Sequence, residues 1–476
     1  MESGLQIKTR CSPEADAEDE PVSPTGQYFN SKSLSVCILA VLETSVPIDD
    51  SGTLPLLREL FLPINPRFSS IMAYDKKGKR RWKKVEVNLQ DHVNVPSFPE
   101  SLSVESYDDN FDKYLTKLTT KILPEDRPLW EIHILKYPTS KAAGHIIFKL
   151  HHALGDGYSL MGALLSCLQR ADNPSLPLTF PSTKSNKNAN KSRAKSFTSC
   201  IQNFFSVING ATFDFGWTVF KSACIADDKT PIRSGDKDLA CHPVKISTVA
   251  FSMDQLKLIK TKLQVTISAV ITGIVSLGVR LYMQGNDTGF NNSRTTALVL
   301  LNTRNINGYM SIQDMLKADN KIWGNQFAFL HVDLPKLTTN KTLNPLDFVS
   351  KAQKNILRKR NSPAVYLTGQ FLEIIRKFRG PEAAAQYIKG TCKRSSLGIT
   401  SLIGPVEQMA CAKHPVKGLY FMPIGVHKSL VVSVMSYMGT MRIGIGTEKG
   451  YIDSQRLVCC IDTAFELIYK AATLSK

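Results

Sequence analysis

The sequence predicts a mixed α/β protein with two lobes, each built from a mixed sheet flanked by helices. The chain has 476 residues, 43% hydrophobic and 21% charged, which is enough for two domains. Apolar segments with the spacing of strands alternate with segments that have the spacing of helices. Near the middle, the polar segment PSTKSNKNANKSRAKS has the composition of a solvated connection between lobes.

The predicted first lobe covers residues 25–180. It follows a polar, acidic segment, residues 1–24, which has no apolar core of the kind found in a secretory signal and is expected to be a mobile tail. The apolar pattern predicts strands at residues 34–42, 69–73 and 85–89, and a helix at residues 107–118.

Residues 181–241 are predicted to form a basic linker, and residues 242–476 the second lobe. Ser252 is expected to cap a helix over residues 253–263, and Ser268 a helix over residues 268–283. Further strands are predicted at residues 245–251, 295–304, 324–335, 397–403, 417–422 and 430–445, the last bent at Gly439, and further helices at residues 346–360 and 455–472.

Charge and cysteine content narrow the possible functions. The 59 basic and 41 acidic residues give a net charge of +18, which favours a polyanionic partner: nucleic acid, an anionic membrane surface or a phosphate-bearing cofactor such as coenzyme A. The ten cysteines contain no C-x-x-C pair, so neither a zinc site nor a disulfide framework is predicted. A reducing compartment is the simpler expectation.

Two segments bear on membranes. Residues 197–220 are the nearest candidate for a span, but their polar residues favour an interfacial or packed segment. The run KKGKRRWKK, residues 76–84, is either a solvated hairpin or a contact for anionic lipid headgroups or coenzyme A phosphates.

The segment GHIIFKLHHALGDGYSLMGALLSCLQRA, residues 144–171, is the most informative. It predicts a buried strand, a turn and a helix from Tyr158. If the strand persists, His151 and His152 point to opposite sides, so one of them reaches a given cavity. Asp156, in a tight turn that Gly155 and Gly157 permit, can orient a histidine or brace the loop.

Such a turn suits base catalysis. A neutral imidazole can take the proton of an attacking hydroxyl and return it to a leaving thiolate, and no covalent nucleophile is needed. The alternative is that both histidines are packed or surface residues in an ordinary turn. A metal pair is disfavoured because the side chains diverge and no third ligand has suitable spacing, so no metal site is predicted.

The turn resembles the HHxxxDG motif of the acyltransferase superfamily that includes chloramphenicol acetyltransferase, peptide-synthetase condensation domains and plant BAHD enzymes. Within this superfamily, the chain is similar to the plant wax ester synthase/diacylglycerol acyltransferases. The supporting segments span almost the whole chain after the tail: SPTGQYF (23–29), NPRFSS (65–70), PLWE (128–131), LLNTRN (300–305), GNQFAF (324–329), GPVEQ (404–408) and HPV (414–416).

The resemblance implies two chloramphenicol-acetyltransferase-like lobes with an active-site tunnel between them that reaches the histidine from both faces. It makes His152 the general base, His151 auxiliary and Asp156 structural, with Gly157 completing the motif. The PLW element falls on Pro128, Leu129 and Trp130, which either bind substrate or pack in the core at a strand start.

Four further positions are singled out. Arg304 stands where related enzymes have an arginine that pairs with the motif aspartate, so an Arg304–Asp156 ion pair is expected, the alternative being an arginine that faces solvent. Asn325 is a candidate oxyanion donor. The family usually has an Asn-Asp pair where this chain has Ser268 and Ala269, which puts the level of activity in question.

The expected function is transfer of a long-chain acyl group from acyl-CoA, a co-substrate rather than a bound cofactor, to a fatty alcohol or to diacylglycerol. The alternatives are a BAHD-like transferase acting on a soluble hydroxylated metabolite, and an acyl-CoA- or lipid-binding protein that has lost catalysis. The resemblance also implies peripheral contact with the cytosolic face of the endoplasmic reticulum or plasma membrane, and no nucleic acid partner.

Overall fold

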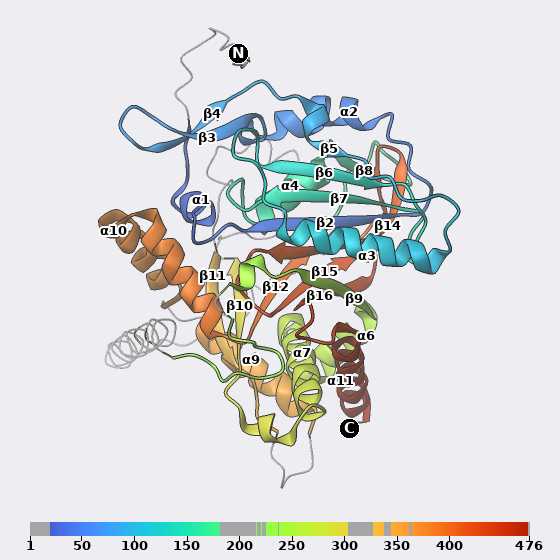
Figure 1. Ribbon diagram of the computed structural model, residues 1–476. Helices are drawn as coiled ribbons and strands as arrows, with labels where there is room; N and C mark the ends of the chain where they lie inside the picture. The colour runs from blue at the N-terminus through green and yellow to red at the C-terminus, as the bar shows by residue number, and fades with distance from the viewer. Residues whose placement is uncertain are drawn as a thin grey trace, which may run out of the picture.

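The computed structural model describes residues 20–180, 225–236, 238–302, 327–337, 344–360 and 364–474, with the single positions 216 and 220. Two large sheets are stacked one above the other, each with its own helices (Figure 1). This confirms the predicted two-lobed, mixed α/β fold.

The first lobe is built on a seven-stranded sheet with the order β5-β6-β7-β2-β14-β13-β8. The bounds of its strands are β5 Val93–Asn94, β6 Trp130–Leu135, β7 Gly144–His151, β2 Cys37–Thr44, β14 His414–Ile424, β13 Met409–Cys411 and β8 Leu168–Arg170. Its helices are α1 Pro24–Phe29, α2 Thr53–Leu56, α3 Val104–Thr120 and α4 Gly157–Ser166. A separate three-stranded sheet contains β1 Glu20–Pro21, β4 Arg80–Lys84 and β3 Ser70–Tyr74.

The second lobe is built on a six-stranded sheet with the order β11-β10-β12-β15-β16-β9. Its strands are β11 Phe327–Asp333, β10 Thr296–Asn302, β12 Leu397–Ile403, β15 Leu430–Tyr437, β16 Thr440–Glu448 and β9 Val244–Ser252. Its helices are α6 Met253–Leu263, α7 Ile267–Gln284, α9 Leu346–Arg360, α10 Ala364–Arg394 and α11 Ser454–Leu474. Helices α6, α7, α9 and α11 pack together against the sheet (Figure 1).

The continuous apolar segments of the sequence became the central strands. All eight residues of β2 and all eight of β7 are buried, as expected for strands with neighbours on both sides. Helix α7 is, within the described part of the chain, one helix long and apolar enough to cross a membrane, but 78% of it is buried inside the protein. We therefore interpret α7 as the core helix of the second lobe. Most of residues 197–220 lies outside the described residues.

Two predictions of individual strands are wrong. No strand forms at residues 85–89; β4 lies just before them and forms a hairpin with β3, and contact of this hairpin with lipid headgroups or coenzyme A phosphates stays a prediction. Residues 430–445 are two antiparallel strands, β15 and β16, that turn at Met438 and Gly439, both with positive φ. A left-handed pair closes a tight turn rather than a bend.

Two predicted boundaries also move. Helix α7 begins at Ile267, and its N-cap is Thr266, whose extended backbone lets its hydroxyl accept from Ala269 N–H at 3.2 Å, so Ser268 is not the cap. Ser252 caps α6 as predicted. The predicted tail of residues 1–24 extends too far, because Glu20–Pro21 pairs with β4 as a strand.

The two lobes do not divide cleanly at residue 242. Strands β13 and β14 come from the C-terminal half of the chain, yet β14 pairs with β2 of the first sheet along its length. The crossing strand packs on the second lobe, where a Cβ at Gly446 would lie 2.8 Å from Met422 Sδ. An ion pair of 2.6 Å between Glu43 and Arg442 adds a polar contact between the lobes.

Candidate active site

The turn between β7 and α4 is fixed by the strands on both sides of it. The N–H of His151 donates to Leu129 O at 3.0 Å, and that of His152 donates to Val36 O at 2.8 Å. Leu154 N–H then donates to His151 O at 3.0 Å, which closes the turn. The segments that lead into β6 and β2 therefore hold the backbone of both histidines in place.

Both nitrogen atoms of the His151 ring are occupied. Nδ1 accepts a hydrogen bond from Ala153 N–H at 3.1 Å, so it carries no proton, and Nε2 lies 3.2 Å from Ser35 Oγ. Burial, with smaller effects from His152 and Lys149, lowers the pKa of His151 to about 3. The ring is neutral with its lone pair engaged by the backbone, so His151 shapes the turn and is a poor candidate for the base.

The ring of His152, which lies just after the end of β7, has different contacts. Its side chain is 7% exposed, and it packs on Phe29 with 4.5 Å between ring centroids. Phe29, at the end of α1, belongs to a cluster that includes Val36 of the first lobe and Leu298 and Ala385 of the second. His152 therefore lies beside the junction of the two lobes.

Asp156 is the N-cap of α4. Its Oδ1 accepts hydrogen bonds from the backbone N–H and the hydroxyl of Ser159, both at 3.1 Å. A carboxylate at this position is also stabilised by the positive end of the helix dipole. Of the two roles predicted for Asp156, these contacts support bracing of the loop.

Gly155 and Gly157 are needed for space, not for an unusual backbone conformation. Neither has a positive φ, so the predicted reason for the glycines is wrong. A Cβ on Gly155 would lie 2.8 Å from Ser159 Cβ, and one on Gly157 would lie 3.0 Å from Leu402 Cδ2. Leu402 belongs to β12, so Gly157 allows the second lobe to approach the start of α4.

A guanidinium without a predicted role supports the turn from the opposite side. Arg67 is 3% exposed, donates from Nη1 to Leu154 O at 3.0 Å and forms an ion pair with Glu20 at 2.6 Å. Asn65 accepts from Arg67 N–H at 3.0 Å and fixes the start of this segment. The NPRFSS motif was the available signal, and its function is to hold the turn that carries His152.

The PLW element lies in the core of the first lobe. Trp130 is fully buried, donates from its indole N–H to Phe68 O at 2.9 Å, and stacks on His92 with 4.1 Å between centroids. Pro128 and Leu129 are buried beside it. The prediction that these residues bind substrate is therefore not supported, and their packing positions the carbonyl that holds His151.

Other predicted residues are not brought to this turn by the described structure. Arg304 and Asn325 lie outside the described residues, so the Arg304–Asp156 ion pair and the oxyanion role of Asn325 stay predictions. In the first turn of α7, Ser268 is exposed and Ala269 is buried. The described residues contain no group of three His, Cys, Asp or Glu that could hold a metal ion.

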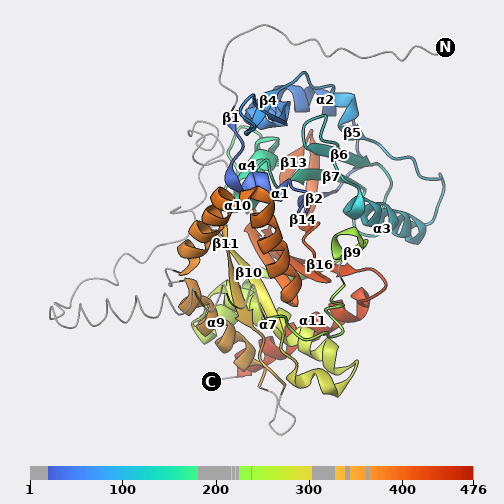
Figure 2. The ribbon, with the colours of Figure 1, turned by 60° about the vertical axis from the view of Figure 1, so that its left-hand side comes forward.

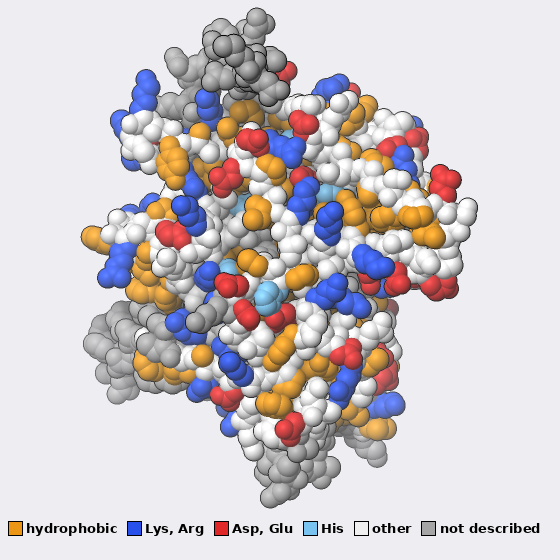
Figure 3. Space-filling view, in the orientation of Figure 1, with side chains coloured by type: hydrophobic (Ala, Val, Ile, Leu, Met, Phe, Trp, Pro, Cys, Tyr) orange, Lys and Arg blue, Asp and Glu red, His pale blue; other side chains and the backbone are white. Residues whose placement is uncertain are grey.

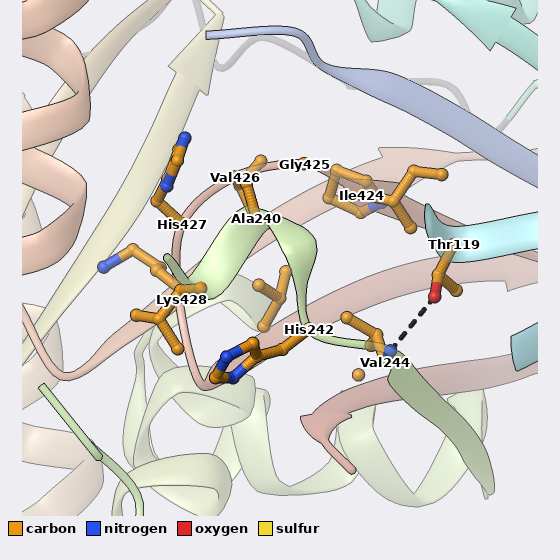
Figure 4. Close-up of a pocket in the computed structure, with 13 residues that line it drawn as sticks. Thr119, Ala240, His242, Val244, Ile424, Gly425, Val426, His427 and Lys428 are labelled. Carbon is orange, nitrogen blue, oxygen red and sulfur yellow. Dashed lines mark hydrogen bonds between the residues drawn. The ribbon is translucent and has the colours of Figure 1, made fainter. Parts of the chain in front are cut away.

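A pocket is found at the lobe junction, but His152 does not line it. It is small and partly open to solvent, and lies between the β14–β15 loop and the segment that leads into β9 (Figure 4). His242, His427 and Lys428 contribute to its wall. Lys428 donates from Nζ to carbonyls at the end of α10, so its charge serves the helix end. The predicted tunnel to His152 stays a prediction.

Acidification is expected to destabilise the protein through its buried histidines. Burial lowers the pKa of His145 and of His151 to about 3 and that of His427 to about 4, from an ordinary value of 6.5. Between the pKa values of the folded protein and 6.5, the unfolded state binds more protons than the folded state. The contribution of these histidines to stability is therefore complete above pH 6.5 and decreases as the pH falls below it. Each histidine contributes a slope of up to about 1.4 kcal/mol per pH unit.

Urea unfolding at a series of pH values from 7.5 down to 4.5 measures this effect. Replacing His145 by glutamine removes one titrating group and is expected to reduce the slope. A free energy of unfolding that does not change over this interval would contradict the prediction.

Residues 34–271 match the model of the wax ester synthase/diacylglycerol acyltransferase catalytic domain, and residues 323–469 match the C-terminal domain model of the same family. The chain belongs to the wax ester synthase/diacylglycerol acyltransferase family. It is therefore an acyltransferase, and the catalytic-domain match includes the whole turn that carries His152.

Individual wax ester synthase/diacylglycerol acyltransferases are similar to this chain over almost its whole length. Wax ester synthase/diacylglycerol acyltransferase 7 of Arabidopsis thaliana is 28% identical over 467 residues, which cover 93% of this chain and 95% of that protein. Wax ester synthase/diacylglycerol acyltransferase 4 of the same plant is 27% identical over 484 residues, which cover 96% of this chain and 91% of that protein.

Solved structures confirm the fold. The wax ester synthase/diacylglycerol acyltransferase of Marinobacter aquaeolei VT8 superposes with a TM-score of 0.59 at 15% identity, covering 96% of this chain and all of that one (100%). The starter condensation domain of rhizomide synthetase gives a TM-score of 0.53 at 10% identity and covers 96% and 94%. The likeness extends over both lobes of each protein.

Proposed function

We propose that this acyltransferase transfers a long-chain acyl group from acyl-CoA to the hydroxyl of a fatty alcohol or of diacylglycerol, with His152 as general base. One observation carries the proposal: the HHxxxDG turn holds His152 beside the lobe junction, while the ring of the neighbouring His151 is engaged by Ala153 N–H. The names of the Arabidopsis relatives and the Marinobacter enzyme include both wax ester synthesis and diacylglycerol acyl transfer.

The reaction needs one base and no covalent enzyme intermediate. An unprotonated nitrogen of His152 takes the proton of the acceptor hydroxyl as its oxygen attacks the thioester carbonyl. The resulting tetrahedral oxyanion collapses, the C–S bond breaks, and the imidazolium returns the proton to the coenzyme A thiolate. The products are an ester and free coenzyme A, and the imidazole is again neutral.

The surrounding residues contribute by restricting the base. Hydrogen bonds that His151 and His152 donate to Leu129 O and Val36 O, and one that Leu154 O accepts from Arg67, fix the backbone of the turn, so little motion is needed before proton transfer. Oxyanion stabilisation requires donors aimed at the developing charge, and we propose Asn325 as one of them.

The apolar substrates place the proposed reaction at a membrane. Long-chain alcohols and diacylglycerol partition into bilayers, and the net charge of +18 favours an anionic surface. We therefore propose peripheral association with the cytosolic face of the endoplasmic reticulum or plasma membrane.

Purified protein incubated with labelled palmitoyl-CoA is expected to form labelled ester with hexadecanol, with diacylglycerol, or with both. Parallel reactions resolved by thin-layer chromatography measure the two products, and free thiol release measures coenzyme A independently. Equal amounts of ester and thiol are expected, because each attack on the thioester frees one coenzyme A.

Two results would replace this proposal. Ester formation with soluble hydroxylated metabolites alone would identify a BAHD-like transferase. Tight palmitoyl-CoA binding without ester from any acceptor would identify a binding protein, for which the buried Ala269 in place of a family aspartate would be the first position to test by substitution.

A further inference from the structure

Helix α10 is a helical hairpin with an exposed apex. Gly380 has φ of 85° and ψ of 170°, which interrupts the helix, and Pro381 begins the second arm. A Cβ built on Gly380 would have no heavy atom within 4 Å, so the apex is open. The hairpin lies at the outer edge of the molecule beside α1 (Figures 1 and 2).

The first arm of α10 exposes apolar side chains next to the apex. Ile374 is 53% exposed and Phe378 is 85% exposed, and their four-residue spacing places them on one face. The adjoining, inward face carries Leu372 and Ile375, which pack on the cluster that contains Phe29. The hydrophobic partner of the helix therefore lies on that face, while Ile374 and Phe378 point toward solvent.

Basic side chains lie on the same edge of the molecule as this apolar face. Lys377 and Arg379, both exposed, flank Phe378 along the helix. The β3–β4 hairpin adds three exposed lysines at its tip, and Tyr74 beside them is 68% exposed. These lysines are Lys76, Lys77 and Lys79. Hydrophobic and basic side chains lie together along the same edge of the molecule, over α10 and the β3–β4 hairpin (Figure 3).

The two elements are joined through α1. Arg80 of β4 donates from Nη1 to Asn30 O at 2.5 Å, at the C-cap of α1. Helix α1 packs on α10, and Tyr28 of α1 has its pKa raised by burial and, to a smaller extent, by Glu373 of α10. Phe29, the next residue, is the one that packs on His152. Helix α1 therefore lies between the exposed residues of α10 and the proposed base, and contacts both α10 and His152.

We propose that Ile374, Phe378, Lys377, Arg379 and the lysines of the β3–β4 tip form a docking surface for an anionic phospholipid bilayer. Protruding apolar side chains bordered by flexible cations match the interface of such a bilayer: the apolar groups enter the acyl boundary, and the ammonium groups remain at the phosphates. The proposal rests on the proposed function, since a docked α10 would place α1 and His152 close to substrates dissolved in the membrane.

The test is sedimentation with vesicles of phosphatidylcholine alone and of phosphatidylcholine mixed with phosphatidylserine, without acyl substrates. The wild-type protein is expected to bind the anionic vesicles and to be released by salt. The double substitution Ile374→Glu with Phe378→Glu is expected to weaken binding at least about tenfold. Leu474→Glu, at 81% exposure near the opposite end of the second lobe, is the matched control and is expected to bind normally.

A second variant tests the charges. Replacing Lys76, Lys77 and Lys79 by glutamate is expected to weaken binding to anionic vesicles about 100-fold, with little effect on vesicles of phosphatidylcholine alone. Affinity for palmitoyl-CoA is expected to remain unchanged. Unchanged vesicle binding with weakened palmitoyl-CoA affinity would assign these lysines to the phosphates of coenzyme A and overturn their role here.

Failure of this inference is distinguishable from failure of the proposed function. If the wild-type protein binds vesicles but forms no ester, the docking surface stands and the proposed function fails. If ester forms from detergent-dispersed hexadecanol while the double glutamate variant binds vesicles like the wild type, the proposed function stands and the docking surface is rejected.

Discussion

Replacement of His152 by alanine is expected to lower the rate of acyl transfer by about a hundred- to ten-thousand-fold, the usual contribution of a positioned base. Stability should fall by about 1–2 kcal/mol, because the ring packs on Phe29 while the turn itself is held by backbone hydrogen bonds. Initial rates of thiol release from palmitoyl-CoA in the presence of hexadecanol measure the loss.

Two companion variants separate the chemistry from the fold. His152→Gln retains volume and polarity but not basicity, so it should be as inactive as the alanine variant. His151→Asn can still accept from Ala153 N–H, so its activity should fall far less. Circular dichroism and thermal unfolding check that each variant folds. Near-normal turnover in a folded His152→Gln protein would refute the mechanism.

Replacement of Trp130 by alanine is expected to cost about 3–5 kcal/mol of stability, the range for large aromatic side chains in a well-packed core. The indole is fully buried, stacks on His92, and donates to Phe68 O. Its removal would leave both a cavity and an unpaired carbonyl. Urea unfolding monitored by far-ultraviolet circular dichroism measures the change.

The conservative variant Trp130→Phe decides between core packing and substrate binding. It keeps most of the apolar volume and loses the single hydrogen bond, so a cost of about 1–2 kcal/mol and an almost unchanged KM are expected. A large increase in KM for the acyl acceptor with little loss of stability would restore the substrate-binding interpretation of the PLW element.

The strand, turn and helix around His152 could be predicted because their signals are local. An apolar run long enough for a buried strand, two glycines around Asp156 and a helical spacing of leucines occur within one short segment. The alternation of strand side chains applied only if the strand reached His152, but β7 ends at His151, so the turn sets the direction of the His152 ring. The sequence could not show why Gly157 is glycine, because the side chain it avoids, Leu402, belongs to the other lobe.

The missed features depend on distant contacts. Arg67 supports the turn through Leu154 O, but nothing in NPRFSS indicates which carbonyl its guanidinium reaches. Residues 85–89 alternate as a strand does, yet β4 is set by its pairing with β3 one segment earlier. Thr266 and Ser268 are both acceptable caps, and Thr266 is selected because Gln353 of α9 also accepts from its N–H and hydroxyl. In each case tertiary contacts decided between locally equivalent choices.

Strand β14 is synthesised late, and this affects the folding and expression of the protein. Strand β2 lies near the N-terminus, and its neighbour in the sheet, β14 (His414–Ile424), leaves the ribosome only after almost the whole chain has been translated, a delay on the order of tens of seconds. During that time one side of β2, an apolar strand, is an open edge that can pair with another nascent chain. Truncation before β13 would make that exposure permanent, so N-terminal fragments are expected to aggregate, and expression of soluble protein requires the chain through β14.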